Sequence, residues 1–534
     1  MRILCATNHK ALKEKSEKGG GMKHKVPDIE KARVAFFEKW KKISLLGEVS
    51  NLLSWDQEIN MTGGEASERG EQMALMAELL HKSLTDPDFE EQVQCLLHHG
   101  RGGLLDELTF ASLSEAEYII RCERALPTKL VAALAKHGSR SLDVWQVARK
   151  ENDWKTFAPY LKTMVELTRE KADALVAVGI GKTRYESLLF EFERDFTLAE
   201  VDEMFNILKS ELPPLVNTVL ESVNQVDNSF LFAAYPIDAQ ERICRKIVTA
   251  IGFDWKMGRM DTSVHPFTTN VASATARITN RYSVHNLLEA LYGAIHEAGH
   301  ALYDQGILRE WALTPIGVAG GMALHESQSR FWEVCIGRSI DFSYWCREIL
   351  NKEFSDQLKS TSRDDFYRAV NKAGIHYIRC DSDPLTYNLH ILLRYEMEKS
   401  MFSGELSVAE APEAWNQRFE EFFRCKPPTD KEGILQDVHW ACGLFGYFPS
   451  YTIGNIIAEE LYGAMQKELT EKYMAKRIRC GDFSYILEWL RSRVHIHGRS
   501  NGTKFIVEKA IGKPISATYF LERIKSKYQK IYQF

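Results

Sequence analysis

The feature that most constrains this chain is the segment 291–303, LYGAIHEAGHALY, in which His296, Glu297 and His300 form an HExxH pattern. On an α-helix, residues four apart lie on one face about one turn apart, so the two imidazoles can bind a single zinc ion. Glu297 then lies beside the ion, where a carboxylate takes a proton from water and passes it to a leaving amine. Uncharged residues at 295, 298, 299, 301 and 302 are typical of a buried helix. The pattern predicts a zinc-binding helix with metallopeptidase chemistry rather than a structural polar cluster.

A catalytic zinc ion normally has three protein ligands and an open position, so a third ligand is needed. The extended motif with a third histidine is excluded, because that ligand would fall at Gly306. A glutamate from a following helix is the alternative, since the segment 306–321 is long enough to reverse the chain direction. Glu326 is the predicted third ligand. Glu333, two turns further on, is the competitor, or instead a partner for one of the ligand histidines.

Helical periodicity dominates from about residue 28, for example from Glu71 to Leu84, and predicts a mostly α-helical protein. The pair Pro213-Pro214 is expected where a helix starts or ends. One exception is 268–282, TTNVASATARITNRY, which predicts a short strand or hairpin just before the zinc helix, with a mere connector as the alternative. Residues 1–25 are expected to be a disordered extension, and 26–534 a single domain.

Composition narrows the class of protein. A hydrophobic content of 45% and a net charge of -5 are typical of an ordinary soluble globular protein and weigh against nucleic acid as the main partner. The ten cysteines lie singly, which indicates reduced thiols. The N-terminal segment lacks the apolar core of a secretory signal, and no later run has the length of a membrane span, so we expect no membrane partner and a cytoplasmic location.

Ordered blocks along the chain make a family resemblance specific. The HEAGH segment is followed by 325–328, HESQ, and further blocks are SWDQE at 54–58, HPF at 265–267, TYNLH at 386–390, RYE at 394–396, GILQDVHW at 433–440, GYFPSY at 446–451 and HIHG at 495–498. Over about residues 30–534 the chain resembles the carboxypeptidase Taq family of metallocarboxypeptidases. The resemblance implies a helical, saddle-shaped subunit with a deep groove, usually a homodimer, that removes C-terminal amino acids from peptides with a free C-terminus.

The resemblance also implies a ligand set and a general base. By that likeness His296, His300 and Glu326 bind one zinc ion per subunit, with cobalt or another divalent ion as an alternative, and Glu297 is the base. A carboxypeptidase must also bind a terminal carboxylate, most simply with a bidentate arginine. Arg394 is the first choice and Arg277 the second, although either can instead be a structural ion-pair partner.

The remaining candidates concern the oxyanion and the orientation of substrate. A tetrahedral intermediate needs a donor for its developing negative charge. Four residues are candidates for that role, with core packing as the alternative for each: His265, His439, Tyr447 and Tyr451. Gln436 and Asp437 are candidates for orienting a substrate or a ligand histidine.

Two positions depart from the family pattern. Thr275 stands where the family has an aspartate, although Arg277 and Thr279 match, and Pro384 replaces an acidic residue in 382–384. Neither change touches a predicted ligand, so we expect retained catalysis with an altered preference or rate.

Two other functions stay open. One is an oligopeptidase or aminopeptidase with the same ligands, which would still cleave peptides with an amidated C-terminus. The other is a non-catalytic helical binding scaffold with a vestigial metal site; Glu297 argues against it, because a structural site has no use for a base.

Overall fold

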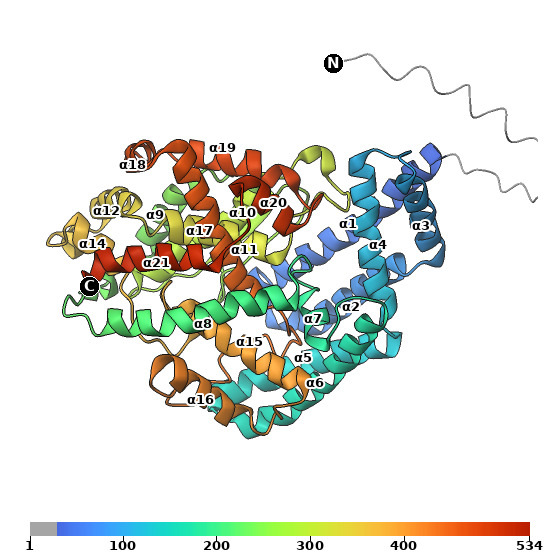
Figure 1. Cartoon of the computed structure of the whole chain (residues 1–534), viewed down its shortest axis with the longest axis horizontal. Coiled ribbons are helices and arrows are strands. Elements are labelled where there is room, and N and C mark those ends of the chain that lie inside the picture. Colours follow the sequence, from blue (N-terminus) through green and yellow to red (C-terminus); the bar gives the residue numbers. More distant parts are fainter. Residues whose placement is uncertain (1–28) are drawn as a thin grey trace, which may run out of the picture.

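The computed structural model describes residues 29–534, and the extension predicted at 1–25 lies outside the described residues. The N-terminal half consists of helices α1 (Ile29–Ile59), α2 (Ala66–Leu84), α3 (Pro87–Arg101), α4 (Glu107–Ala125), α5 (Thr128–Glu151), α6 (Trp154–Ala177), α7 (Arg184–Leu189), α8 (Leu198–Leu220) and α9 (Ile237–Ala250). Helices α1 to α4 form a block at one end of the molecule (Figure 1). Apolar side chains of α1, α3 and α4, such as Phe36, Phe89 and Leu113, give this block a buried cluster of its own.

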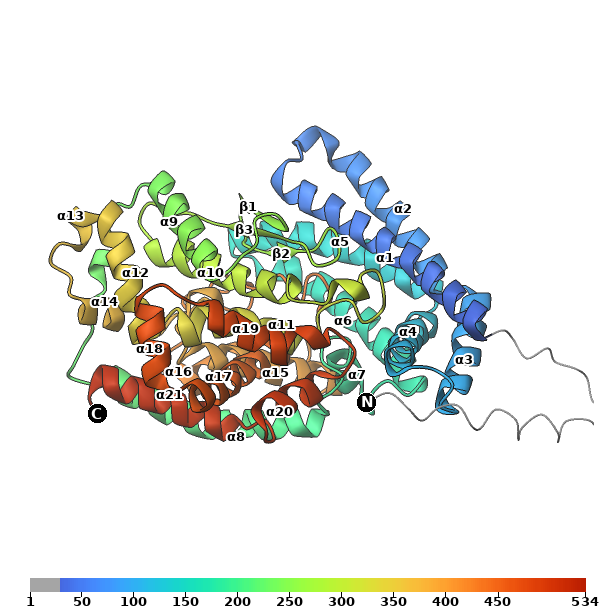
Figure 2. The ribbon, with the colours of Figure 1, turned by 90° about the horizontal axis from the view of Figure 1, so that it is seen from above.

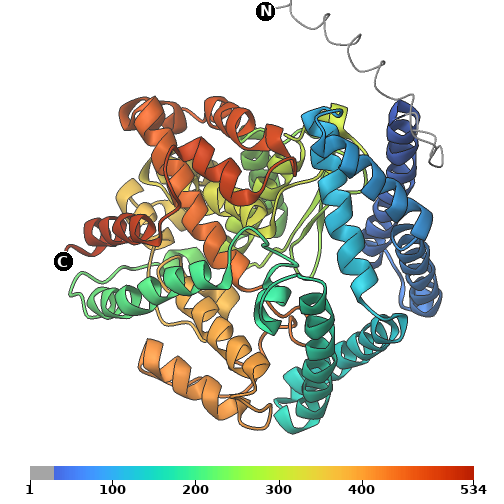
Figure 3. The ribbon, with the colours of Figure 1, turned by 45° about the vertical axis from the view of Figure 1, so that its right-hand side comes forward.

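The middle of the chain holds three strands and the helices that follow them. They are β1 (Gly258–Thr262), β2 (Thr268–Thr269), β3 (Ala276–Asn280), α10 (Leu287–Asp304), α11 (Met322–Arg330), α12 (Ile340–Glu353), α13 (Ser355–Leu358) and α14 (Arg363–Val370). The C-terminal part is again helical, with α15 (Tyr387–Ser403), α16 (Ala411–Phe423), α17 (Pro449–Leu469), α18 (Glu471–Arg479), α19 (Ser484–Arg493), α20 (Thr503–Ile511) and α21 (Ala517–Tyr532). In Figure 3 the C-terminal helices, in red, lie opposite the N-terminal block, in blue.

The strands form one small sheet in the order β1-β3-β2, in which β1 runs parallel and β2 antiparallel to β3. Ala276 and Ile278 of β3 are fully buried, and the Asn280 side-chain amide donates to the Ala290 carbonyl of α10 at 3.0 Å. The sheet therefore lies directly on α10 (Figure 2). A mostly α-helical fold with a small sheet beside the predicted zinc helix is confirmed, although the sequence analysis missed β1.

The proline pair at 213–214 does not end a helix. Helix α8 continues through both residues to Leu220. Packing of α8 against α15 and α21 accounts for this, because tertiary contacts outweigh the roughly 3 kcal/mol that an interior proline costs a helix. None of the helices in residues 29–534 has the length together with the apolar character that crossing a bilayer requires.

Helices α10, α11 and α17 pack unusually closely, and two glycines make this possible. A Cβ on Gly299 of α10 would lie 2.6 Å from the Ser329 Cα of α11, and one on Gly454 of α17 would lie 2.8 Å from the Glu326 Cγ. Such distances leave no room for a side chain at either position. The backbones of α10 and α11 are thereby brought close enough for His296, His300 and Glu326 to meet.

Candidate metal centre

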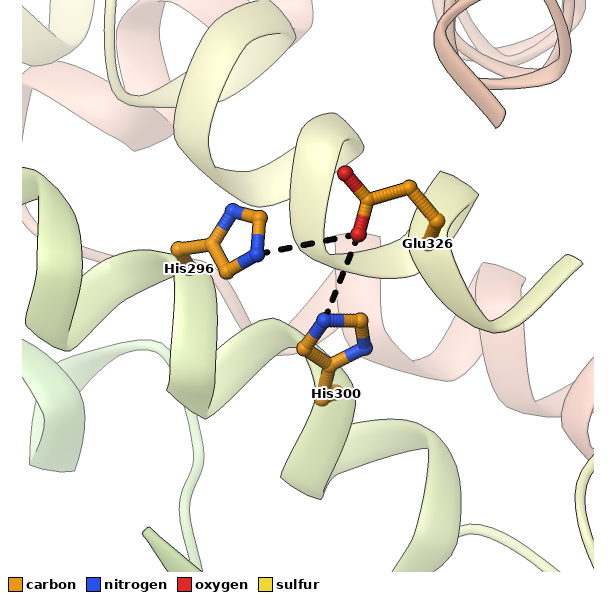
Figure 4. A group of neighbouring side chains, drawn as sticks. All are labelled: His296, His300 and Glu326. Atoms are coloured by element: carbon orange, nitrogen blue, oxygen red, sulfur yellow. Dashed lines mark ion pairs between the residues drawn. The ribbon is translucent and has the colours of Figure 1, made fainter. Parts of the chain in front are cut away.

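Three predicted ligands converge between α10 and α11 (Figure 4). The Glu326 Oε2 atom lies 3.4 Å from His300 Nε2 and 3.7 Å from His296 Nε2. The three donor atoms all lie within 4.8 Å of one another. Zinc bonds of about 2.0–2.2 Å at tetrahedral angles separate neighbouring donors by roughly 3.3–3.6 Å. Two imidazole nitrogens and a carboxylate oxygen at this spacing fit a divalent cation.

The second nitrogen of His296 has a partner of its own. His296 Nδ1 lies 2.9 Å from Glu333 Oε2, and Arg330 Nη1 donates to the same oxygen at 2.7 Å. A hydrogen on Nδ1 leaves the Nε2 lone pair directed at the centre, so Glu333 selects the tautomer that a ligand needs. Glu333 lies on a π-helical turn, Phe331–Ile336, that continues α11. Of the two roles that the sequence leaves open for Glu333, the geometry matches the partner of a ligand.

Opposing effects set the charges at the centre when no cation is bound. Burial lowers the pKa of His296, but the carboxylates of Glu326 and Glu333 outweigh burial and raise it to about 9. Burial raises the pKa of Glu326, but the nearby His296 and His300 lower it to about 2. A positive charge is therefore strongly favoured at this point. Either a proton or a metal cation can supply it.

Glu297 lies beside the three ligands and is held by the sheet. Its side chain is 7% exposed, and its Oε2 atom accepts a hydrogen bond of 2.6 Å from the Thr268 hydroxyl of β2. The sequence places β2 near this helix but gives no signal for that contact. A buried carboxylate next to a metal centre is in position to act as a general base.

Tyr447, Tyr451 and His439 form an aromatic wall near Glu326. Tyr447 and Tyr451 pack edge to face with ring centroids 5.2 Å apart, and His439 Nε2 lies 3.3 Å from the Tyr451 hydroxyl. Burial, with a contribution from Glu326, raises the pKa of Tyr447 to about 12. Burial lowers the pKa of His439 to about 4. Near neutral pH both tyrosines are therefore neutral hydrogen-bond donors, and His439 is uncharged. His265, in contrast, is exposed in the loop between β1 and β2.

The predicted carboxylate ligand Arg394 lies in the interior. Its side chain is 0% exposed, its Nε donates to Asp437 Oδ2 at 2.6 Å, and its Nη1 donates to the His390 carbonyl. The guanidinium also lies over the Trp415 ring. In this structure Arg394 is a buried ion-pair partner, the alternative that the sequence left open, and it is not placed to touch a substrate.

Asp437 and Gln436 hold a second arginine that sequence reasoning missed. Arg379 donates from Nε and Nη2 to Asp437 Oδ1 at 3.1 and 2.9 Å and from Nη1 to the Tyr387 hydroxyl at 3.0 Å. Gln436 Oε1 accepts from the Arg379 backbone N–H at 2.7 Å. The Arg379 guanidinium lies 5.1 Å from the centre of the Tyr451 ring, at the aromatic wall. Gln436 and Asp437 therefore orient Arg379, and neither is seen to orient a ligand histidine.

The other candidate arginine lies at the sheet. The Arg277 guanidinium stacks on the ring of Trp55 from α1 at 4.1 Å. Burial, together with the charge of Arg259, lowers the pKa of Arg277.

The two departures from the family pattern occupy tight turns. The Thr275 hydroxyl donates to the Ala272 carbonyl at 2.7 Å, in the segment between β2 and β3. Next to Pro384, the Asp383 carboxylate accepts from the backbone N–H groups of Gly374 and Leu385 at 3.0 and 2.9 Å. Both turns are closed by hydrogen bonds within the chain. Their effect on substrate preference remains a prediction.

Comparison with known proteins gives a consistent result. The model of the carboxypeptidase Taq (M32) metallopeptidase family matches residues 35–528. The chain is 36% identical to thermostable carboxypeptidase 1 of Thermus thermophilus, over 92% of this chain and 97% of that one. It is 33% identical to carboxypeptidase 1 of Bacillus subtilis, over 93% and 98%. A crystal structure of an M32 carboxypeptidase from Deinococcus radiodurans is similar with a TM-score of 0.89 and 31% identity, covering 94% of this chain and 100% of that one.

Proposed function

Since the chain belongs to the carboxypeptidase Taq (M32) family of metallopeptidases and is a metallocarboxypeptidase, we propose that it uses zinc, held by His296, His300 and Glu326, with Glu297 as general base. The observation that carries this proposal is the convergence of two imidazoles and one carboxylate beside a buried fourth residue, Glu297. A bound divalent cation supplies Lewis-acid chemistry there, because it polarises a carbonyl and makes water more acidic. The donor set suits zinc, and cobalt is a possible substitute.

The proton transfers in this mechanism belong to Glu297. Its carboxylate takes a proton from the attacking water as the oxygen bonds to the scissile carbonyl carbon. It then delivers that proton to the leaving nitrogen as the carbon–nitrogen bond breaks. The products are a shortened peptide with a new carboxylate and a free amino acid. The substrate is expected to lie in the deep groove of the saddle-shaped subunit that the family resemblance implies.

We assign the oxyanion contact to Tyr447, supported by Tyr451 and His439. Tyr447 keeps its proton near neutral pH, because burial raises its pKa to about 12, and it lies near enough to Glu326 for that carboxylate to contribute to the shift. His439, uncharged because its pKa is about 4, lies within reach of the Tyr451 hydroxyl and orients it. His265 stays a candidate for contacting the substrate from the exposed loop between β1 and β2.

We propose that Arg379 binds the terminal carboxylate of the substrate, with Arg277 as the alternative. A guanidinium has five N–H donors, and Arg379 uses three in its contacts with Asp437 and Tyr387. Two donors remain for an incoming carboxylate. Asp437 and Gln436 keep the guanidinium against the aromatic wall, where the C-terminal peptide bond of the substrate would face the cation. Arg394, in the interior, forms an ion pair with Asp437 and so helps to hold Asp437 in place.

Two further properties belong to the proposal. A reducing, cytoplasmic location is supported by the nine cysteines of residues 29–534, each of which is a free thiol. A homodimer is supported by exposed apolar side chains at helical spacing on α1 and α2: Leu45, Val49, Leu52, Leu75 and Leu79 are each at least 40% exposed.

A pair of peptides with identical sequence, one with a free and one with an amidated C-terminus, tests the function. Mass spectrometry of a timed digest should show loss of single residues from the free C-terminus only, and no cleavage after treatment with a chelator. Equal cleavage of both peptides would instead favour the oligopeptidase or aminopeptidase. The variant Glu297→Gln should retain the metal and lose turnover, whereas unchanged turnover would show that the assigned base is wrong.

A further inference from the structure

The Thr268 hydroxyl makes a short contact with the carboxylate of Glu297. Thr268 Oγ1 lies 2.6 Å from Glu297 Oε2 and 3.1 Å from the Glu297 backbone carbonyl oxygen. A hydroxyl has a single hydrogen to donate, and a charged carboxylate oxygen at the shorter distance is the stronger acceptor. The hydroxyl therefore donates to Oε2, while the other carboxylate oxygen, Oε1, does not share this contact.

The strand that carries Thr268 is short, but it is fixed on the side facing β3. The backbone N–H of Thr279 donates to the Phe267 carbonyl at 2.9 Å, and the Phe267 N–H donates to the Thr279 hydroxyl oxygen, also at 2.9 Å. Ser263 donates its hydroxyl to the same Thr279 oxygen at 2.7 Å. Thr279 is 0% exposed. These bonds anchor Phe267, the residue immediately before Thr268. The Thr268 hydroxyl is therefore held in a fixed position outside α10.

Glu297 needs such a point, because its helix fixes only its backbone. A glutamate side chain has three rotatable bonds, and a base that samples several rotamers is correctly placed only part of the time. His296 and His300 gain their orientation from neighbours and from the cation they bind. Glu297 is not a ligand, so the cation does not orient it in the same way.

We propose that Thr268 is the positioning residue for the general base: its hydroxyl holds Glu297 Oε2 and leaves Oε1 free to face the attacking water. The proposal rests on the proposed function, since it assumes that Glu297 is the base. Thr268 itself transfers no proton to the substrate. Its contribution is orientation, which should appear in kcat rather than in substrate affinity.

Three variants of the metal-loaded full-length enzyme test this. Thr268→Val removes the hydroxyl and keeps the shape, Thr268→Ser restores the hydroxyl, and Thr269→Val is the matched control, since its side chain points to the opposite face of β2. We expect Thr268→Val to lower kcat roughly 10- to 100-fold with KM changed less than about twofold. Thr268→Ser and Thr269→Val should remain within about threefold of the wild type, because both keep the contact. Metal content and thermal melting should be the same in all four proteins.

Crystal structures of the metal-loaded wild type and of Thr268→Val provide a readout independent of activity. The Glu297 carboxylate should leave its wild-type position, or occupy several positions, only in the valine variant. The proposal is overturned if Thr268→Val keeps its kcat, if the loss appears in KM, if serine fails to restore the rate, or if the carboxylate does not move. Failure of the proposed function is distinguishable, because in that case Glu297→Gln would stay active.

Discussion

Gly299 of α10 lies against the backbone of Ser329 in α11, so closely that a Cβ atom on Gly299 would be 2.6 Å from the Ser329 Cα. Helix α10 therefore contacts α11, the helix of Glu326, at Gly299, which lies within the HExxH motif. A side chain at this position would clash with α11, and removing the clash would require α10 and α11 to move apart. Movement of that kind also separates His296 and His300 from Glu326.

We therefore expect Gly299→Ala to weaken both folding and metal binding. Overpacking of a buried contact destabilises a protein by roughly 1–3 kcal/mol, and the ligand set should lose its spacing. Urea unfolding and a chelator competition measure the two effects. Gly47→Ala in α1 is the control, since nothing lies within 4 Å of its added Cβ, and it should be neutral or stabilising. Unimpaired metal affinity in Gly299→Ala would contradict the role assigned to this contact.

Glu333 should control metal affinity without being a ligand. The variant Glu333→Gln keeps the size of the side chain but removes the charge that acts on His296 Nδ1. We expect metal affinity to fall roughly 10- to 100-fold, measured by competition with a fluorescent chelator. Glu297→Gln, which changes a neighbouring carboxylate that does not bind His296 Nδ1, should retain wild-type affinity. An equal loss of metal affinity in both variants would show that removal of any nearby negative charge weakens binding, and that the contact with His296 Nδ1 has no special role.

The metal-free protein should become less stable as the pH rises from about 6.5 to about 9. The pKa of His296 is raised from 6.5 to about 9 in the folded state, so its proton binds more tightly to the folded than to the unfolded chain. The resulting stability is fully present below pH 6.5 and is lost as the pH rises through 9. Urea unfolding of chelator-treated protein at several pH values measures it. His296→Asn should flatten this dependence, and a bound cation should remove it, because the cation replaces the proton.

Substitution of Arg379 should act on substrate binding. Arg379→Ala is expected to raise KM for peptides with a free C-terminus by at least about tenfold, since a charge-assisted contact contributes roughly 1.5–3 kcal/mol. Steady-state kinetics with free and amidated peptides measure the loss of discrimination. Arg277→Ala is the comparison. A larger increase in KM for Arg277→Ala than for Arg379→Ala would show that Arg277, on β3, binds the terminal carboxylate instead.

The dimer prediction can be tested on the exposed apolar side chains of α1 and α2. The double variant Val49→Glu, Leu75→Glu places two charges among side chains that are 45% and 55% exposed, and we expect it to be monomeric by light scattering after gel filtration. Val223→Glu, at a position that is 93% exposed elsewhere, should have the mass of the wild type. A double variant with the wild-type mass would place any dimer interface on another surface.

The parts of the centre that depend on local geometry could be predicted from the sequence. The spacing of His296 and His300 follows from the period of a helix, and a chain reversal between Gly306 and Gly321 brings Glu326 to face them. The role of Glu333 stayed open, because it depends on a π-helical turn that hydrophobic periodicity does not reveal.

Contacts between distant segments could not be predicted in the same way. β1 has no alternating pattern and exists because it pairs with β3. Arg379 and Arg394 meet at Asp437, but the sequence analysis names Arg394 as a candidate and misses Arg379. Both arginines are buried, and their contacts distinguish them: Arg394 lies over the Trp415 ring, and Arg379 lies over the Tyr451 ring at the aromatic wall.

The π-helical turn after α11 constrains how relatives of this chain can vary in length. Glu326 of α11 and Glu333 of the π-helical turn that continues it reach the two nitrogens of one imidazole. Removal or addition of one residue between them would rotate one carboxylate by about 100° relative to the other. A gap in 327–332 therefore changes the relative orientation of the two carboxylates, whereas a point change there keeps their spacing along the chain. Active relatives should align across this segment without a single insertion or deletion, even where their sequences share little else.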